Sequence, residues 1–147
     1  MKLVRPSSII ICCVLLFNTQ CNEDDEVLLP LTLCDAVTVI NSELYENAES
    51  DFNSIVNVDI SQNCLTITVS ASGCSGDTWV FGLVGSETVM ESSPVQRNVR
   101  LVLTNDEACL AVFTQEQSFD LSPLQVEGEN EVLLSIQDFS DQIMYSY

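Results

Sequence analysis

The sequence has no histidine and almost no basic residues. Its 147 residues include 22 Asp and Glu against four Lys and Arg. Lys2 and Arg5 lie at the start, so residues 21–147 hold two basic and all 22 acidic residues, a net charge of −20. Such a chain repels nucleic acid, and we expect no nucleic-acid partner. The lack of histidine excludes the usual general base, Ser-His-Asp and Cys-His sites, and most zinc or copper ligand sets.

Long apolar runs are also missing. The run at residues 8–17, SIIICCVLLF, is about ten residues long, whereas a membrane-spanning helix needs roughly 20. Because Lys2 and Arg5 precede this short run, it is typical of an export signal. The apolar run gives way to Asn18-Thr19-Gln20 and then Cys21, and an acidic run, Glu23–Glu26, follows.

This N-terminal arrangement resembles the signal region of a bacterial lipoprotein of the Gram-negative, surface-exported type. The resemblance covers about residues 1–26 and implies that residues 1–20 are a signal peptide cut before a lipidated Cys21. Residues 21–33 would then be the lipidated cysteine with its acidic tether, anchored in the outer membrane and exposed on the cell surface. Two or three acyl chains anchor a protein stably where one does not. The alternative is an ordinary signal cut, with Cys21 in a solvated linker.

The remaining cysteines favour two disulfides. Of seven cysteines, Cys12 and Cys13 leave with the signal and Cys21 carries the lipid, so Cys34, Cys64, Cys74 and Cys109 remain. An even number in an exported chain indicates disulfide pairs. A Cys64–Cys74 bond is disfavoured, because the strand predicted between them spans about 33 Å and bonded Cα atoms lie within about 7 Å. Two pairings stay open, and we prefer Cys34–Cys64 with Cys74–Cys109 over Cys34–Cys74 with Cys64–Cys109. A zinc site is disfavoured, because C-x-x-C spacing is absent.

Alternation of apolar and polar residues predicts strands through residues 34–147, the expected single domain. The clearest hairpin alternates apolar residues at 56–60 and again at 65–71, around a turn at 61–63. Further strands are expected at 36–40, 79–84, 99–103, 109–114, 132–136 and 143–147. Residues 42–49 can form a short helix with Asn41 or Ser42 as its cap, residues 86–96 a long connection, and residues 119–126 an irregular segment or edge strand. The predicted fold is an all-β, antiparallel β-sandwich of about seven to nine short strands, with immunoglobulin-like topology.

Acidic loops are the candidate metal sites. Calcium prefers several oxygen ligands from loops, and three loops of this chain offer them. The candidate ligands are Asp77, Asp106, Glu107, Glu127, Glu129 and Glu131. None of these loops fits the D-x-D-x-D-G pattern, so we expect solvated surface charge, with calcium as the one possible cofactor.

The two arginines of the domain are the remaining candidates for ligand contacts. Arg97 and Arg100 lie three residues apart on a predicted strand, so they point to opposite faces, and each is expected to pair with carboxylates. Arg97 is the weak candidate for recognising a carboxylate or an acidic sugar. Trp79 alternates with Phe81 and Leu83 and is expected in the core, against the alternative of a glycan-stacking platform with the tyrosines.

Two functions remain open. The first is a non-catalytic binding or assembly module at the cell surface, with a protein or glycan partner. The alternative is a small carboxylate-based or metal-assisted enzyme acting on extracellular glycans. The first is favoured, because residues 21–147 lack histidine and lysine and the chain has no G-x-S-x-G motif.

Overall fold

The structure is a computed structural model, and it describes residues 33–147. The predicted signal peptide 1–20, the lipidation site Cys21 and all but the last residue of the tether 21–33 lie outside the described residues and stay predictions. None of the helical segments within residues 33–147 has the length and apolar character needed to span a membrane.

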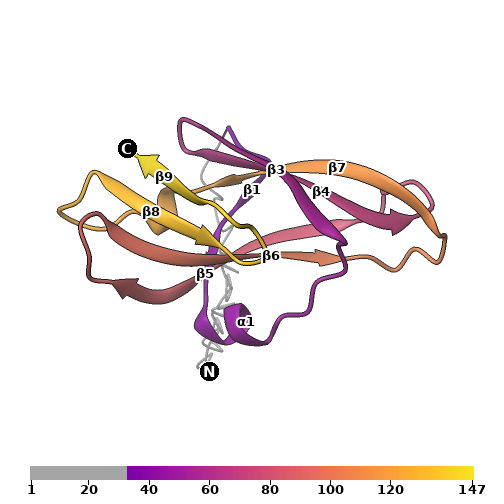
Figure 1. Cartoon of the computed structure of the whole chain (residues 1–147), viewed down its shortest axis with the longest axis horizontal. Coiled ribbons are helices and arrows are strands. Elements are labelled where there is room, and N and C mark those ends of the chain that lie inside the picture. The colour runs from indigo at the N-terminus through magenta and orange to yellow at the C-terminus, as the bar shows by residue number, and fades with distance from the viewer. Residues whose placement is uncertain (1–32) are drawn as a thin grey trace, which may run out of the picture. The chain divides into compact units, whose positions relative to one another are not determined.

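Within residues 33–147, nine strands form two sheets that pack face to face (Figure 1). The four-stranded sheet has the order β1 (Ala36–Val37), β7 (Ala111–Asp120), β4 (Cys64–Gly73), β3 (Ser54–Ser61). The five-stranded sheet has the order β2 (Val39–Ile40), β5 (Val80–Met90), β6 (Val95–Thr104), β8 (Glu131–Ile136), β9 (Gln142–Ser146). The helical segments are α1 (Ser42–Asn47) and the 3-10 turn η1 (Ser122–Leu124). The all-β sandwich is therefore confirmed.

The sheets are mixed rather than purely antiparallel. The pairs β1–β7, β2–β5 and β6–β8 are parallel, and the other four pairs are antiparallel. The predicted strand 36–40 divides at the buried Thr38, so that its first half joins one sheet and its second half the other. The three parallel pairs depart from the purely antiparallel sandwich that the sequence predicted.

The core lies between the sheets, where period-two alternation predicted it. Leu65, Ile67 and Val69 of β4 are fully buried and face Val99 and Leu103 of β6, which are also at 0% exposure. Every second residue of a strand points to the same face, and apolar side chains therefore line one face of each sheet. Trp79 belongs to this core, as predicted.

The predicted long connection at residues 86–96 is wrong. β5 continues to Met90 and β6 begins at Val95, so the two strands form one long hairpin. A register shift between Gly85 and Val89 interrupts the pairing. Because a bulge of this kind inserts residues into one strand, the apolar alternation is lost in the part of β5 beyond Gly85.

The predicted end of the strand at Thr114 is also wrong. β7 runs unbroken to Asp120, as an inner strand between β1 and β4. Gln115 and Gln117 share the face of β7 that carries Phe113 and the buried Phe119, and they pair with Val69 and Ile67 of the neighbouring β4. These two polar residues interrupt the apolar alternation, so the sequence pattern does not predict the second half of β7.

Two smaller expectations fail at strand surfaces. A register shift between Ile55 and Asn57 leaves Val56 54% exposed, although it was predicted to share a face with Val58. Apolar residues on both faces of 79–84 predict a strand that is covered on both faces, but only the middle of β5 is covered: Val84 is buried, whereas Val80 is 64% exposed. The helix prediction is confirmed, since the Asn41 side chain caps α1 by accepting a hydrogen bond from the Leu44 amide at 2.9 Å.

Candidate functional site

The four cysteines of the domain form the preferred pairing. Cys34 is bonded to Cys64 and Cys74 to Cys109, with Cα separations of 5.5 and 4.8 Å. The first bond joins the start of the described chain to the beginning of β4. The second joins the loop after β4 to the loop before β7, and it lies beside a second, non-covalent link between the same loops.

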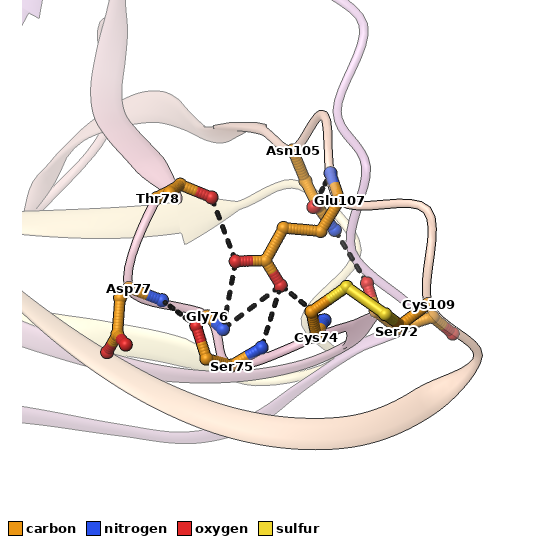
Figure 2. Close-up of a disulfide and its surroundings, with 9 residues drawn as sticks. All are labelled: Ser72, Cys74, Ser75, Gly76, Asp77, Thr78, Asn105, Glu107 and Cys109. Carbon is orange, nitrogen blue, oxygen red and sulfur yellow. Dashed lines mark hydrogen bonds between the residues drawn. A yellow bond between two sulfur atoms is a disulfide. The ribbon is translucent and has the colours of Figure 1, made fainter.

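That second link is the carboxylate of Glu107 (Figure 2). Its oxygens accept hydrogen bonds from the amides of Cys74, Ser75 and Gly76, the latter two at 3.0 and 3.1 Å, and from the Thr78 hydroxyl at 2.8 Å. Successive backbone N–H groups that converge in this way form a nest for an anion. We call this arrangement the Glu107 clasp.

The clasp fixes the charge state of Glu107. The amide of Ser75 contributes most, and together with the Gly76, Thr78 and Cys74 donors it lowers the pKa of Glu107 from 4.5 to about 2. Hydrogen bonds to the charged form favour that form, so the carboxylate is ionised through the whole ordinary pH range. The clasp thereby gives Glu107 a structural role that sequence reasoning missed.

The other predicted calcium ligands do not gather around Glu107. Asp77 and Asp106 are exposed near the clasp, Glu127 and Glu129 are exposed in a separate turn, and Glu131 begins β8. Within residues 33–147 no group of three or more His, Cys, Asp or Glu side chains is placed to hold a metal ion. Calcium binding therefore stays a prediction from the sequence alone.

Arg97 lies on the inner side of β6. It follows the same alternation as Val99 and Leu101, and its Nη1 donates to the Ser86 carbonyl oxygen at 3.2 Å. Its Nε is buried and has no hydrogen-bond partner in the described part of the chain. Burial lowers the pKa of Arg97, and the nearby Tyr147 partly offsets this effect.

Arg100 points to the opposite face, as predicted, and holds α1 against the sheet. Its Nη1 donates to the Ala48 carbonyl oxygen at 2.6 Å, and its Nε to Oε1 of Gln137 at 2.7 Å. Its guanidinium carbon lies 5.6 Å from the centre of the Tyr45 ring. Neither arginine forms an ion pair among residues 33–147, so the predicted pairing with carboxylates is wrong for the described residues.

The predicted alternative of an aromatic platform does not form. Trp79 is 8% exposed and Tyr145 is fully buried. The Tyr145 hydroxyl donates to Oδ1 of Asn63 at 2.9 Å and accepts from Nε2 of Gln125 at 2.9 Å, while burial raises its pKa. These rings serve packing rather than ligand contact.

Arg100 also lines a polar pocket of about 420 Å³, which we call the Arg100 pocket. It lies between two segments beside β6, namely residues 48–55, which lead from α1 into β3, and the β8–β9 turn. β8 pairs with β6 only as far as Val99. The pocket opens beyond that point, where segment 48–55 takes the place of a neighbouring strand.

Backbone hydrogen bonds hold both walls of the Arg100 pocket. The Asp51 amide donates to the Leu103 carbonyl oxygen at 2.9 Å, and the Asn53 amide to that of Ser70 at 2.7 Å. On the other side, the Gln137 amide donates to the carbonyl oxygen of Val99 at 2.9 Å. Segment 48–55 is therefore attached to both sheets, and the pocket is part of the folded framework.

The lining combines hydrogen-bonding groups with an apolar wall. Asn53, Gln137 and Asp138 offer polar side chains beside Arg100, and Phe52 is the one aromatic residue. Asp138 is the only acidic residue of the lining. The pocket can therefore donate and accept hydrogen bonds, but it lacks a pair of carboxylates.

Sequence reasoning missed the Arg100 pocket. It favoured Arg97 as the ligand contact, because both arginines were visible only as isolated charges on one strand. The lining comes from three segments that are distant in the sequence, and nothing in the pattern brings residues 52–55 to residues 137–138. Asp138 has a left-handed backbone conformation, with φ of 64°, which Asp and Asn tolerate better than most residues. Because a single Asp is common in turns, its presence in the sequence does not indicate a pocket.

The sequence matches no protein-family model and no curated protein. Solved structures with the same fold include a protein of unknown function (DUF1344) from Bacteroides vulgatus, with 15% identity and a TM-score of 0.50, over 79% of this chain and 57% of that one. Another is a NigD-like immunity protein from Bacteroides caccae, with 12% identity and a TM-score of 0.54, over 75% of this chain and 59% of that one. This chain spans less than two thirds of either structure, and at such identities the likeness shows the fold alone.

Proposed function

We propose that this protein is a lipid-anchored module of the bacterial cell surface that binds a protein or glycan partner without catalysing a reaction. The resemblance of residues 1–26 to a lipoprotein signal region supports the anchor. The two disulfides support export, because such bonds persist in oxidising compartments. The likeness to the fold of a NigD-like immunity protein is compatible with a non-catalytic role.

The observation that carries the binding role is the composition of the Arg100 pocket. Glycosidases use two carboxyl groups, about 5 Å apart in retaining enzymes and about 6.5–9.5 Å apart in inverting ones. The Arg100 pocket contains Asp138 alone, beside amides and a guanidinium. This set suits recognition by hydrogen bonding, and it favours a binding module over the carboxylate-based enzyme.

The anchor is tested by the intact mass of the protein purified from membranes, measured with and without reduction. We expect a chain that begins at Cys21, carries added acyl mass, and gains the mass of four hydrogens on reduction. A Cys21→Ala variant should lose the acyl mass and leave the membrane fraction. An unlipidated, freely soluble wild-type chain would contradict the anchored role.

Surface exposure requires a separate test. Protease added to intact cells should digest the wild-type protein while leaving a periplasmic marker untouched. Protection of the chain in intact cells, with digestion only after lysis, would place it on the inner side of the outer membrane.

A further inference from the structure

We infer that the Arg100 pocket binds one neutral pyranose ring of a glycan. The inference deepens the proposed function and rests on it for the class of partner. The pocket volume of about 420 Å³ lies in the lower part of the range for small-molecule sites. A recess of this size has room for one ring, whereas a protein partner needs a broad complementary surface.

The donors of the pocket are oriented before any ligand arrives. Arg100 uses Nε for Gln137 and Nη1 for Ala48, and within residues 33–147 no hydrogen bond involves its Nη2. Oε1 of Gln137 is held by the guanidinium at 2.7 Å, so the amide NH₂ of Gln137 points away from Arg100. Side chains whose rotamers are already fixed lose less entropy when they bind.

The Arg100 pocket also offers hydrogen-bond acceptors. Asp138 lies in the β8–β9 turn with an exposed carboxylate, and Asn53 offers both a carbonyl and an NH₂ group. Each sugar hydroxyl donates one hydrogen bond and accepts others, so it needs donors and acceptors together. Arg100, Asn53 and Asp138 supply this combination around one recess.

The apolar wall matches the other property of a pyranose ring. Phe52 and Ile55 line the pocket and pack against the hydrophobic core, which holds them in place. The C–H groups of a pyranose make one face of the ring apolar, and such a face packs favourably on an aromatic side chain. A purely polar ion would leave this wall without a partner.

Charge decides between neutral and acidic sugars. Asp138 places a negative charge in the lining, which also contains the positive charge of Arg100. Residues 21–147 carry two basic and 22 acidic residues, and a field of this sign lowers the local concentration of anions. A uronic acid is therefore disfavoured at a site where a neutral hexose meets no repulsion.

The test is binding of the full mature protein, purified in detergent, to a panel of oligosaccharides of equal length. The panel contains neutral oligomers of mannose, galactose and glucose, and galacturonate oligomers as the acidic set. We expect at least one neutral oligomer to bind and the galacturonate set to fail. Asp138→Asn, which keeps the left-handed turn, and Asn53→Ala should each weaken binding about tenfold or more.

Matched controls separate the pocket from the rest of the surface. Asp77→Asn and Asn130→Ala make the same chemical changes at exposed turn residues outside the pocket, and both should leave the affinity unchanged. Arg100 is left intact, because it also holds α1.

Three results would overturn the inference. The first is preferential binding of galacturonate, the second is neutral binding that Asp138→Asn and Asn53→Ala do not weaken, and the third is no binding to any oligosaccharide. If the protein is nevertheless acylated and protease-accessible on cells, the proposed function stands and only the ligand class fails. If it is neither, the proposed function fails independently of the oligosaccharide result.

Discussion

Glu107 shows how a single acidic residue can stabilise a chain that already carries a large excess of negative charge. Its carboxylate meets three consecutive backbone amides and one hydroxyl, and not another charged side chain. The clasp therefore satisfies backbone donors that the loop after β4 would otherwise leave to water.

The first prediction concerns this residue. Glu107→Gln should lower the melting temperature at pH 7, because a neutral amide offers only one acceptor oxygen and places its NH₂ against backbone donors. The folded-state pKa of about 2 lies below the ordinary 4.5. The stabilisation by Glu107 is therefore complete above about pH 4.5 and is lost as the pH falls toward 2. Urea unfolding of the wild type and the variant between pH 2 and pH 7 measures this dependence of the free energy of unfolding on pH.

The variant should show a weaker acid dependence than the wild type in that window. It should keep some dependence, since hydrogen bonds from the Ser118 hydroxyl and amide also lower the pKa of Asp35. Asp106→Asn, next to Glu107 and exposed, is the control and should follow the wild type. If the free energy of unfolding depends on pH in the same way for Glu107→Gln and the wild type, the role assigned to the clasp is contradicted.

The second prediction contrasts the two arginines. Arg100→Met should reduce the free energy of unfolding by about 1–3 kcal/mol, because it removes hydrogen bonds to Ala48 and Gln137. Arg97→Met should reduce it by less, because it removes one hydrogen bond, to the Ser86 carbonyl oxygen, and also removes a buried Nε that has no partner. Urea unfolding of both variants gives the comparison, and an equal loss in both would be inconsistent with these roles.

At the scale of elements, the sequence predicted strands wherever one face is uniformly apolar. β4 followed from alternation alone, since all inner-face residues from Leu65 to Ala71 are apolar and buried. Of β6 only the second half followed, because Arg97 interrupts the apolar inner face before Val99. β7 could not be predicted in full, because Gln115 and Gln117 lie on its inner face. The bulges in β3 and β5 shift the register by tertiary pairing, which leaves no local signal.

The same limit applies to the candidate site. The cysteine pairing was accessible only in part, since strand length argues against one of the three connectivities and leaves the other two open. The Arg100 pocket was not, because it depends on where β8 stops pairing with β6 and on segment 48–55 filling that place. Both features are contacts between segments that are distant in the sequence. A single sequence indicates local strands and turns better than it indicates such contacts.

The third prediction concerns the Cys74–Cys109 bond and the Glu107 clasp, which link the loop after β4 to the loop before β7. The Cys74–Cys109 bond closes a sequence separation of 35 residues. Removing it with Cys74→Ala and Cys109→Ala should lower the free energy of unfolding by about 2–4 kcal/mol. The Cys74–Cys109 bond also holds Glu107 near the backbone amides that donate to its carboxylate. Removing the bond should therefore weaken the pH dependence of stability that the clasp causes.

A double-mutant cycle checks this coupling. Adding Glu107→Gln to the variant that lacks the Cys74–Cys109 bond should reduce the melting temperature by less than it does in the wild type. If the two effects simply add, the clasp forms independently of the disulfide. The equivalent removal of Cys34–Cys64, at the far end of β4, serves as the control and should leave the effect of Glu107→Gln unchanged.

For the whole molecule, net charge is the property that the sequence gives without any structure. Twenty-two acidic residues and two basic ones in residues 21–147 repel one another, and compaction brings them closer together. Neither arginine forms an ion pair within residues 33–147, so this repulsion is not relieved by paired charges there. Dissolved salt is then the main means of screening it.

The fourth prediction follows from that repulsion. The melting temperature should rise when sodium chloride is increased from about 10 mM to 150 mM, because the screening length shortens from about 30 Å to about 8 Å. Calcium and magnesium chloride, compared at equal ionic strength, should raise it by similar amounts, since no cluster of three ligands is placed for a metal in residues 33–147. Thermal unfolding followed by circular dichroism measures all three series. An excess stabilisation by calcium that saturates at low concentration would instead reveal a specific site, and Asp77→Asn and Glu129→Gln would then show which acidic loop holds it.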